Sequence, residues 1–212
     1  MEKKVRELLD FFEEKIREQY NDHPKFAKEV ISHIENINFD FIEGNNLYNK
    51  FYNKLLEIVV EELYGDYLYQ TNITTSEFLV EKSPLKTIDA NGHSRKLPVE
   101  EEEILEFKSA VNGFFDVNFV IKNGAVRDYQ ENNLLVAFTK NNSDFYFPYL
   151  LYYNWSKIKD IIKENVKNGN YKVLQKENGE QTCMTTLDIS SIGWNCKICI
   201  FRIPITAKLV FL

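Results

Sequence analysis

The sequence lacks the features that would place it in a membrane or in an oxidising compartment. No window reaches the roughly 18 uninterrupted apolar residues that a membrane-spanning helix needs. The amino-terminal residues run into a charged, amphipathic stretch and not into an apolar signal core. Cysteine is scarce, with 3 in 212 residues, and an odd number fits a reducing compartment better than a disulfide framework. We therefore expect a cytoplasmic protein without a membrane segment.

Several motifs of familiar enzyme classes are also missing. The chain has no Gly-rich phosphate loop, no G-x-S-x-G elbow and no dinucleotide fingerprint. These absences argue against a nucleotide cofactor and against serine-hydrolase chemistry. Cys196 and Cys199 have C-x-x-C spacing, but a structural zinc site normally has four ligands and only Cys183 remains as a third cysteine. We interpret the three as buried, reduced thiols.

The composition is that of a folded domain whose acidity is local. A hydrophobic fraction of 44% and an aromatic fraction of 14% supply a substantial core, and 212 residues fall within the range of one large domain. No repeat, low-complexity tract or linker divides the chain, so we expect a single domain over residues 1–212. Residues 31–82 hold nine acids against three lysines and account for the formal net charge of −6. The remainder is close to neutral, which leaves nucleic acid open as a partner.

Apolar residues recur at helical spacing near the amino terminus and at extended spacing after it. Within residues 1–65 they form three stripes, which predict helices around residues 5–16, 24–34 and 47–59. After residue 65 the pattern predicts short strands, with Asn91-Gly92 as a hairpin turn. The strands are expected at 67–69, 78–80, 85–89, 104–108, 115–121, 134–138, 171–173, 198–203 and 207–211, and a later helix at 156–166. This order predicts an α/β (α+β) fold, with a helical part at 1–65 and a strand-rich part at 66–212 that holds a central mixed β-sheet flanked by helices.

The most informative segment is ILEFKS at residues 104–109. Side chains alternate along a strand, so Glu106 and Lys108 share one face while Leu105 and Phe107 pack on the other. A carboxylate can hold a divalent cation, and a neighbouring lysine can orient or help deprotonate a water, or stabilise charge on a phosphate. Because one carboxylate holds Mg²⁺ poorly, a second should converge on the site, and Asp89 on the preceding predicted strand is the best candidate.

An acid followed, after a gap of this size, by apolar-Glu-apolar-Lys-Ser resembles the PD-(D/E)xK nucleases, the group that holds many restriction endonucleases. The resemblance covers roughly residues 55–140. It implies that Asp89, Glu106 and Lys108 are catalytic, with Asp89 and Glu106 holding Mg²⁺. The family often has a proline before its first acid, where this chain has Ile88, so Glu81, Glu103 and Asp116 stay open as the second ligand.

One further residue enters through the same resemblance. Many members place a glutamate from the helix before the sheet near the metal, and Glu62 matches that residue, with Glu61 as the alternative. Apart from the resemblance, the loop that carries His93, Arg95 and Lys96 lies close to Asp89 in sequence, which predicts contacts to DNA phosphates or base edges; a plain polar hairpin is the alternative. The lysines of the later helix, at 157, 159, 163 and 167, are mixed with acids and are interpreted as a solvated face.

These observations predict a Mg²⁺-dependent endonuclease for double-stranded DNA, of the type II restriction class. Symmetric cutting of a duplex implies a homodimer. Two alternatives stay open: a non-enzymatic protein-interaction module that uses the acidic region at 31–82, and a repair or RNA nuclease of the same fold.

Overall fold

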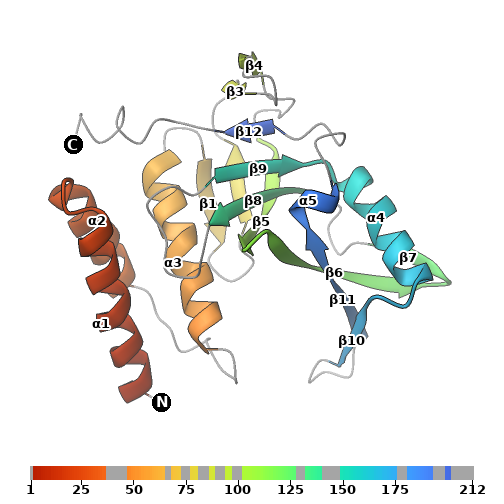
Figure 1. Cartoon of the computed structure of the whole chain (residues 1–212), viewed down its shortest axis with the longest axis horizontal. Helices are drawn as coiled ribbons and strands as arrows, with labels where there is room; N and C mark the ends of the chain where they lie inside the picture. The colour runs from red at the N-terminus through yellow and green to blue at the C-terminus, as the bar shows by residue number, and fades with distance from the viewer. Residues whose placement is uncertain are drawn as a thin grey trace.

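Three helices open the chain, as the apolar spacing predicts. They are α1 (Glu2–Gln19), α2 (Pro24–Glu35) and α3 (Leu47–Tyr64). Pro24 stands in the first turn of α2, where its missing N–H costs no hydrogen bond. Buried side chains occupy most of α3, because this helix lies between the sheet and the α1–α2 pair (Figure 1). The computed structural model describes residues 2–36, 47–64, 68–72, 77–80, 86–88, 94–96, 102–127, 132–139, 149–175, 181–192 and 199–201.

The strands that follow form one mixed sheet. Its main path runs β10-β11-β6-β5-β8-β9-β12-β3-β4, with β2 beside β5, β1 beside β2, and β7 beside β6. β5 and β8 are parallel, and the other pairs are antiparallel. The bounds are β1 Leu68–Asn72, β2 Glu77–Val80, β3 Lys86–Ile88, β4 Ser94–Lys96, β5 Ile104–Val111, β6 Phe114–Lys122, β7 Ala125–Arg127, β8 Asn133–Thr139, β9 Tyr149–Tyr153, β10 Lys172–Gln175, β11 Gln181–Asp188 and β12 Cys199–Phe201. The expected mixed sheet flanked by helices is confirmed. The expected strand at 207–211 lies outside the described residues.

Helices cover the two faces of the sheet separately. On the first face, Leu105 and Phe107 of β5 pack with residues of α1, α2 and α3 in one buried cluster, and we call this the α3 face. On the second face, Ala110 of β5 joins a cluster that includes Ile158 and Ile162 of α4 (Trp155–Lys167), and we call this the α4 face. Figure 1 shows α1–α3 on one side of the strands and α4 on the other. The short helix α5 (Ile189–Ile192) adds Ile192 to the α4 face.

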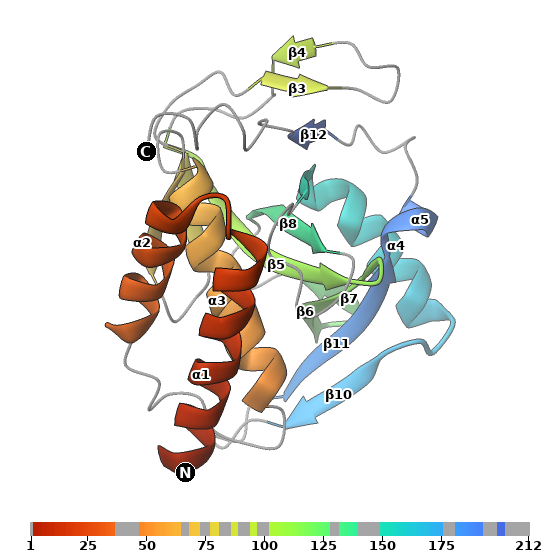
Figure 2. The ribbon, with the colours of Figure 1, turned by 60° about the vertical axis from the view of Figure 1, so that its left-hand side comes forward.

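β5 pairs with one strand on one edge and with two strands on the other edge. β8 accompanies it along its length, from Leu105 opposite Asn133 to Val111 opposite Thr139. On its other edge β5 pairs with β2 at residues 104–106 and with β6 at Val111. The β5–β6 turn has two central residues with positive φ, Asn112 at 51° and Gly113 at 87°, which is the geometry of a type I′ hairpin. The chain then continues into β6, which pairs with β11, and β10 lies beside β11 on its other edge (Figure 2).

Candidate functional site

Glu106 and Lys108 form an ion pair on the α4 face of β5. The Lys108 Nζ lies 2.6 Å from the Glu106 carboxylate, and the two side chains are only 17% and 23% exposed. Strand alternation explains the pairing, because Leu105 and Phe107 between and beside them are buried on the α3 face. The structure therefore brings together two of the residues that the sequence singles out, in the arrangement that the alternation predicts.

Apolar residues border this pair on the β8 side. Leu134 stands opposite Glu106 and Val136 opposite Lys108, and both are fully buried in the α4-face cluster. β9 continues this apolar row, with Tyr153 opposite Leu134. Charges at the border of an apolar layer interact through a lower effective dielectric than charges in water. An ion pair here is consequently stronger than one on an open surface, and so is the attraction of its carboxylate for a cation.

A third ionisable residue, Glu77, faces the pair from the opposite strand. β2 and β5 are antiparallel, and Glu77 stands directly across from Glu106. Residues in this relation lie on the same face with Cβ atoms about 4.5–5.5 Å apart. Two carboxylates and one ammonium are thus gathered on adjacent strands. Glu77 was not predicted, because it precedes the expected strand at 78–80 and its cross-strand partner cannot be found from local spacing.

Oxygen ligands of this kind suit Mg²⁺, which binds through one or two carboxylates and keeps several waters. The described residues contain no group of three or more His, Cys, Asp or Glu side chains arranged to hold a metal ion. Glu77 and Glu106 supply two carboxylates on adjacent strands, a number that suits a cation whose remaining ligands are water and substrate oxygens.

Glu62 does not lie beside Glu106. Its carboxylate is 2.7 Å from Nδ1 of His33 on α2, and its side chain is 17% exposed. Since α3 covers the α3 face and Glu106 projects from the α4 face, the sheet separates the two carboxylates. In this structure Glu62 joins α3 to α2, and its role near a metal stays a prediction. Glu61, the alternative, is partly exposed on the same helix.

The four candidates for the second carboxylate ligand of the metal, Asp89, Glu81, Glu103 and Asp116, lie in different parts of the chain. Asp89 and Glu81 lie outside the described residues. Glu103 accepts hydrogen bonds from Asn133 Nδ2 at 2.6 Å and from the Tyr152 hydroxyl at 3.3 Å, which ties the start of β5 to β8 and β9. Asp116 accepts a hydrogen bond from the Thr186 hydroxyl at 2.6 Å and points to the α3 face, away from Glu106.

The strands around Asp89 lie several positions from β5 in the sheet. β3, which ends at Ile88, pairs with β4 and β12, and β12, β9 and β8 separate it from β5. At about 4.8 Å per strand, β3 is roughly 19 Å from β5. The β3–β4 pairing matches the hairpin expected around Asn91-Gly92. Arg95 and Lys96 lie in β4 at the end of the sheet order, and His93 lies outside the described residues.

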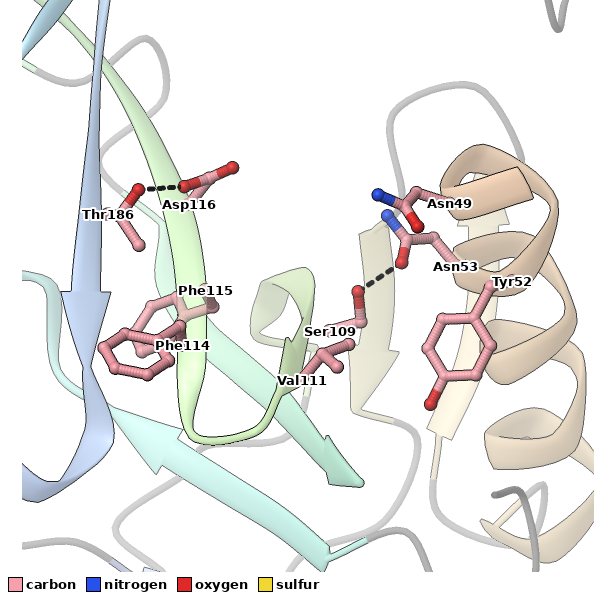
Figure 3. A pocket seen from close by; sticks show the side chains of 9 residues that line it. All are labelled: Asn49, Tyr52, Asn53, Ser109, Val111, Phe114, Phe115, Asp116 and Thr186. Atoms are coloured by element: carbon pink, nitrogen blue, oxygen red, sulfur yellow. Dashed lines mark hydrogen bonds between the residues drawn. The ribbon is translucent and has the colours of Figure 1, made fainter. Parts of the chain in front are cut away.

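A polar pocket of about 390 Å³ opens on the α3 face. Figure 3 shows Asn49 and Asn53 of α3 on one side and Asp116 and Thr186 on the other. Asn53 accepts a hydrogen bond from the Ser109 hydroxyl, so β5 also contributes to its wall. One carboxylate among amides and hydroxyls makes this a mostly uncharged polar site. Lys108 precedes Ser109 but points to the other face, so the pocket does not include the ion pair.

None of the family models, curated proteins and solved structures with which the chain was compared matches it. No described helix is long and apolar enough to cross a membrane. Glu106, Lys108 and Glu77 therefore indicate function through their own chemistry.

Proposed function

We propose that the protein is a Mg²⁺-dependent endonuclease that hydrolyses DNA phosphodiester bonds at the Glu106–Lys108 pair. The observation that carries the proposal is the 2.6 Å contact between these side chains on one face of β5, with Glu77 directly opposite. The resemblance of residues 104–109 to the catalytic strand of PD-(D/E)xK nucleases supports the same reaction.

The two glutamates would hold the metal, and Asp89 is a further candidate ligand. When bound, Mg²⁺ supplies Lewis-acid polarisation of the phosphate and a water of lowered pKa. Glu106 would then share its negative charge between the cation and Lys108, which weakens the ion pair. The Lys108 ammonium would be freed to donate hydrogen bonds to the attacking water or to a phosphate oxygen on which charge develops.

The low exposure of the pair favours this use of Lys108. A partly buried side chain flanked by Leu134 and Val136 has few rotamers to lose, so its ammonium is held near the position where it acts. Water is also partly excluded from the β8 side, which increases the effect of one positive charge on a phosphorane.

Within this activity, a type II restriction endonuclease that cuts a specific duplex site is the proposed class, and it implies a homodimer. A nuclease of the same fold that acts in repair or on RNA would use the same three side chains. A panel of duplex, branched and single-stranded DNA and of RNA separates these classes. Preference for short duplex sites supports the restriction class.

The decisive experiment is incubation of the purified protein with long phage DNA in Mg²⁺ or in EDTA. Discrete fragments that require metal are expected from the wild type. Lys108→Ala should cut at least about 100-fold more slowly, since loss of one group that stabilises transition-state charge typically has this effect. Lys172→Ala, which removes an exposed cation on β10, is the matched control and should cut like the wild type.

Either of two results would overturn the proposal. Intact DNA under all metal conditions would favour the protein-interaction module. Fragments that are unchanged in Lys108→Ala would mean that the nuclease site lies elsewhere on the chain.

A further inference from the structure

A groove with a positively charged rim lies between α4 and the β6–β7 hairpin. It encloses about 560 Å³. Val126 and Val166 contribute its apolar lining, and Val126 is 6% exposed because it belongs to the α4-face core. The cations that line it are Arg127, Lys159, Lys163 and Lys167, and none of its lining residues within the described part of the chain is acidic. In a chain of net charge −6, a cluster of four cations around one groove is a strong local reversal of sign.

The lysines form a regular row. Lys159, Lys163 and Lys167 are spaced four residues apart on α4, so they lie on one stripe with about 6 Å of helix rise between neighbours. Arg127 stands across from this row on β7. The turn between β6 and β7 has positive φ at Asn123 (53°) and Gly124 (75°). This is type I′ geometry, and it holds β7 against β6. A row of cations that faces another cation fits an extended polyanion better than a single small anion.

One acid on the same helix contacts the row. Lys163 Nζ lies 2.8 Å from Asp160, and this hydrogen bond, with the nearby positive charge, lowers the pKa of the Asp160 carboxyl. Both side chains are more than half exposed, so solvent screens the pair. Asp160 does not line the groove, and a phosphate can therefore replace it as the partner of Lys163 at little cost.

We propose that this groove binds the phosphate backbone of DNA. The choice of DNA as the polyanion rests on the proposed nuclease function. The groove inference specifies where on the protein the duplex would be held. α4 covers the same sheet face from which Glu106 and Lys108 project, so a duplex along the groove approaches the sheet from the side of the ion pair. Lysine and arginine contacts to phosphate supply affinity and orientation without reading sequence.

The test measures binding without cleavage. A short labelled DNA duplex is titrated in EDTA over a series of salt concentrations, with fluorescence anisotropy as the signal. The groove variant is Lys159→Gln/Lys163→Gln/Lys167→Gln. The matched control, Lys3→Gln/Lys25→Gln/Lys28→Gln, removes three exposed cations from α1 and α2 with the same change in net charge. Thermal melts verify that both fold.

Each lost phosphate contact reduces the slope of log affinity against log salt by about 0.9. The groove variant should therefore lose a slope of about 2 to 3 and bind about tenfold or more weakly at low salt, while the control stays within about twofold of wild type. Arg127→Gln, which leaves α4 untouched, should lose a slope of about 1.

The inference is overturned if the groove variant binds DNA as tightly as the control variant does. It is also overturned if labelled polyglutamate binds the wild type as tightly as DNA, since the occupant is then an acidic protein segment. The outcome is separable from that of the nuclease proposal. If DNA binding depends on the groove but no metal-dependent cleavage occurs, only the nuclease proposal is overturned. If the protein cleaves DNA and the groove variant binds DNA as the wild type does, only the groove proposal is overturned.

Discussion

Two carboxylates that face each other across neighbouring strands repel when both are ionised, and a cation between them relieves the repulsion. Glu77 and Glu106 stand in this relation. If both hold Mg²⁺, Glu77→Gln should raise the Mg²⁺ concentration needed for half-maximal cleavage by at least about tenfold, the scale of effect seen for residues that tune a metal site. Glu102→Gln, at an exposed turn position, is the control. An unchanged Mg²⁺ requirement in Glu77→Gln would show that Glu77 is not a ligand.

The thiol of Cys183 is a second residue whose environment predicts its chemistry. Cys183 is 7% exposed in the α4-face core, and burial raises the pKa of its thiol above the ordinary value of 9.0. A raised pKa keeps the thiol protonated at neutral pH, and the protonated form is unreactive. In the native protein Cys183 should therefore react with iodoacetamide more slowly than free cysteine at pH 8, and faster as the pH rises. Peptide mapping by mass spectrometry measures this, and equal rates would contradict the buried environment.

Among the elements, α3 carries a buried ion pair in its most buried stretch. Lys54 and Glu57 are 2.8 Å apart, with side chains 10% and 2% exposed. Glu57→Leu should lower the free energy of unfolding by about 3 to 5 kcal/mol, because it removes a buried counter-charge of Lys54. Lys54→Met/Glu57→Leu should restore most of that loss, since replacing both charges by apolar groups is often nearly neutral. Urea denaturation measures both variants, and a double variant as unstable as the single one would contradict this account.

The elements also show what local sequence can and cannot predict. Helical spacing predicts α1, α2 and α3, and the helix predicted at 156–166 corresponds to α4. The strands β9 and β11 were not predicted. β9 is Tyr-Leu-Leu-Tyr-Tyr, apolar at every position, with its described side chains from Leu150 to Tyr153 shared between the two core clusters. Such a run has no alternation to mark it as a strand. β11 is rich in threonine, and its inward face depends on pairing with β6.

The candidate site likewise contains some residues that local sequence predicts and others that it does not. Glu106 and Lys108 were identified because they are neighbours on one strand, and strand alternation alone puts them together. Local sequence does not predict Glu77 or the groove residue Arg127, because each contacts its partners through segments that are distant in the chain. Glu77 reaches Glu106 through the pairing of β2 with β5, and Arg127 reaches the lysines where β7 lies beside α4. The order of the strands in the sheet determines such contacts, and this order depends on the packing of the whole core. For the same reason the sequence did not reveal that β3, next to Asp89, has three strands between it and β5.

In the molecule as a whole, the α3 face and the α4 face of the sheet carry different charged and polar groups. The α3 face carries three helices, the buried Lys54–Glu57 pair and the Asn53–Asp116 pocket. The α4 face carries the Glu106–Lys108 pair and the cations beside α4. In a protein of net charge −6, the cations gathered beside α4 would attract a polyanion to this side of the sheet, and this attraction would orient DNA as it approaches.

A metal that binds only the folded protein stabilises all of it, so the site can be tested without substrate. At a metal concentration about 100 times the dissociation constant, the free energy of unfolding should rise by about 2.7 kcal/mol. For a chain of this size, that gain raises the melting temperature by roughly 5 to 10 °C. We expect such a shift for the wild type and for Glu102→Gln with saturating Mg²⁺, measured by differential scanning fluorimetry against EDTA. Glu106→Gln should lose most of it, because the carboxylate shared by the metal and Lys108 is gone. An equal shift in Glu106→Gln would place any bound metal away from β5, even if the protein cleaves DNA.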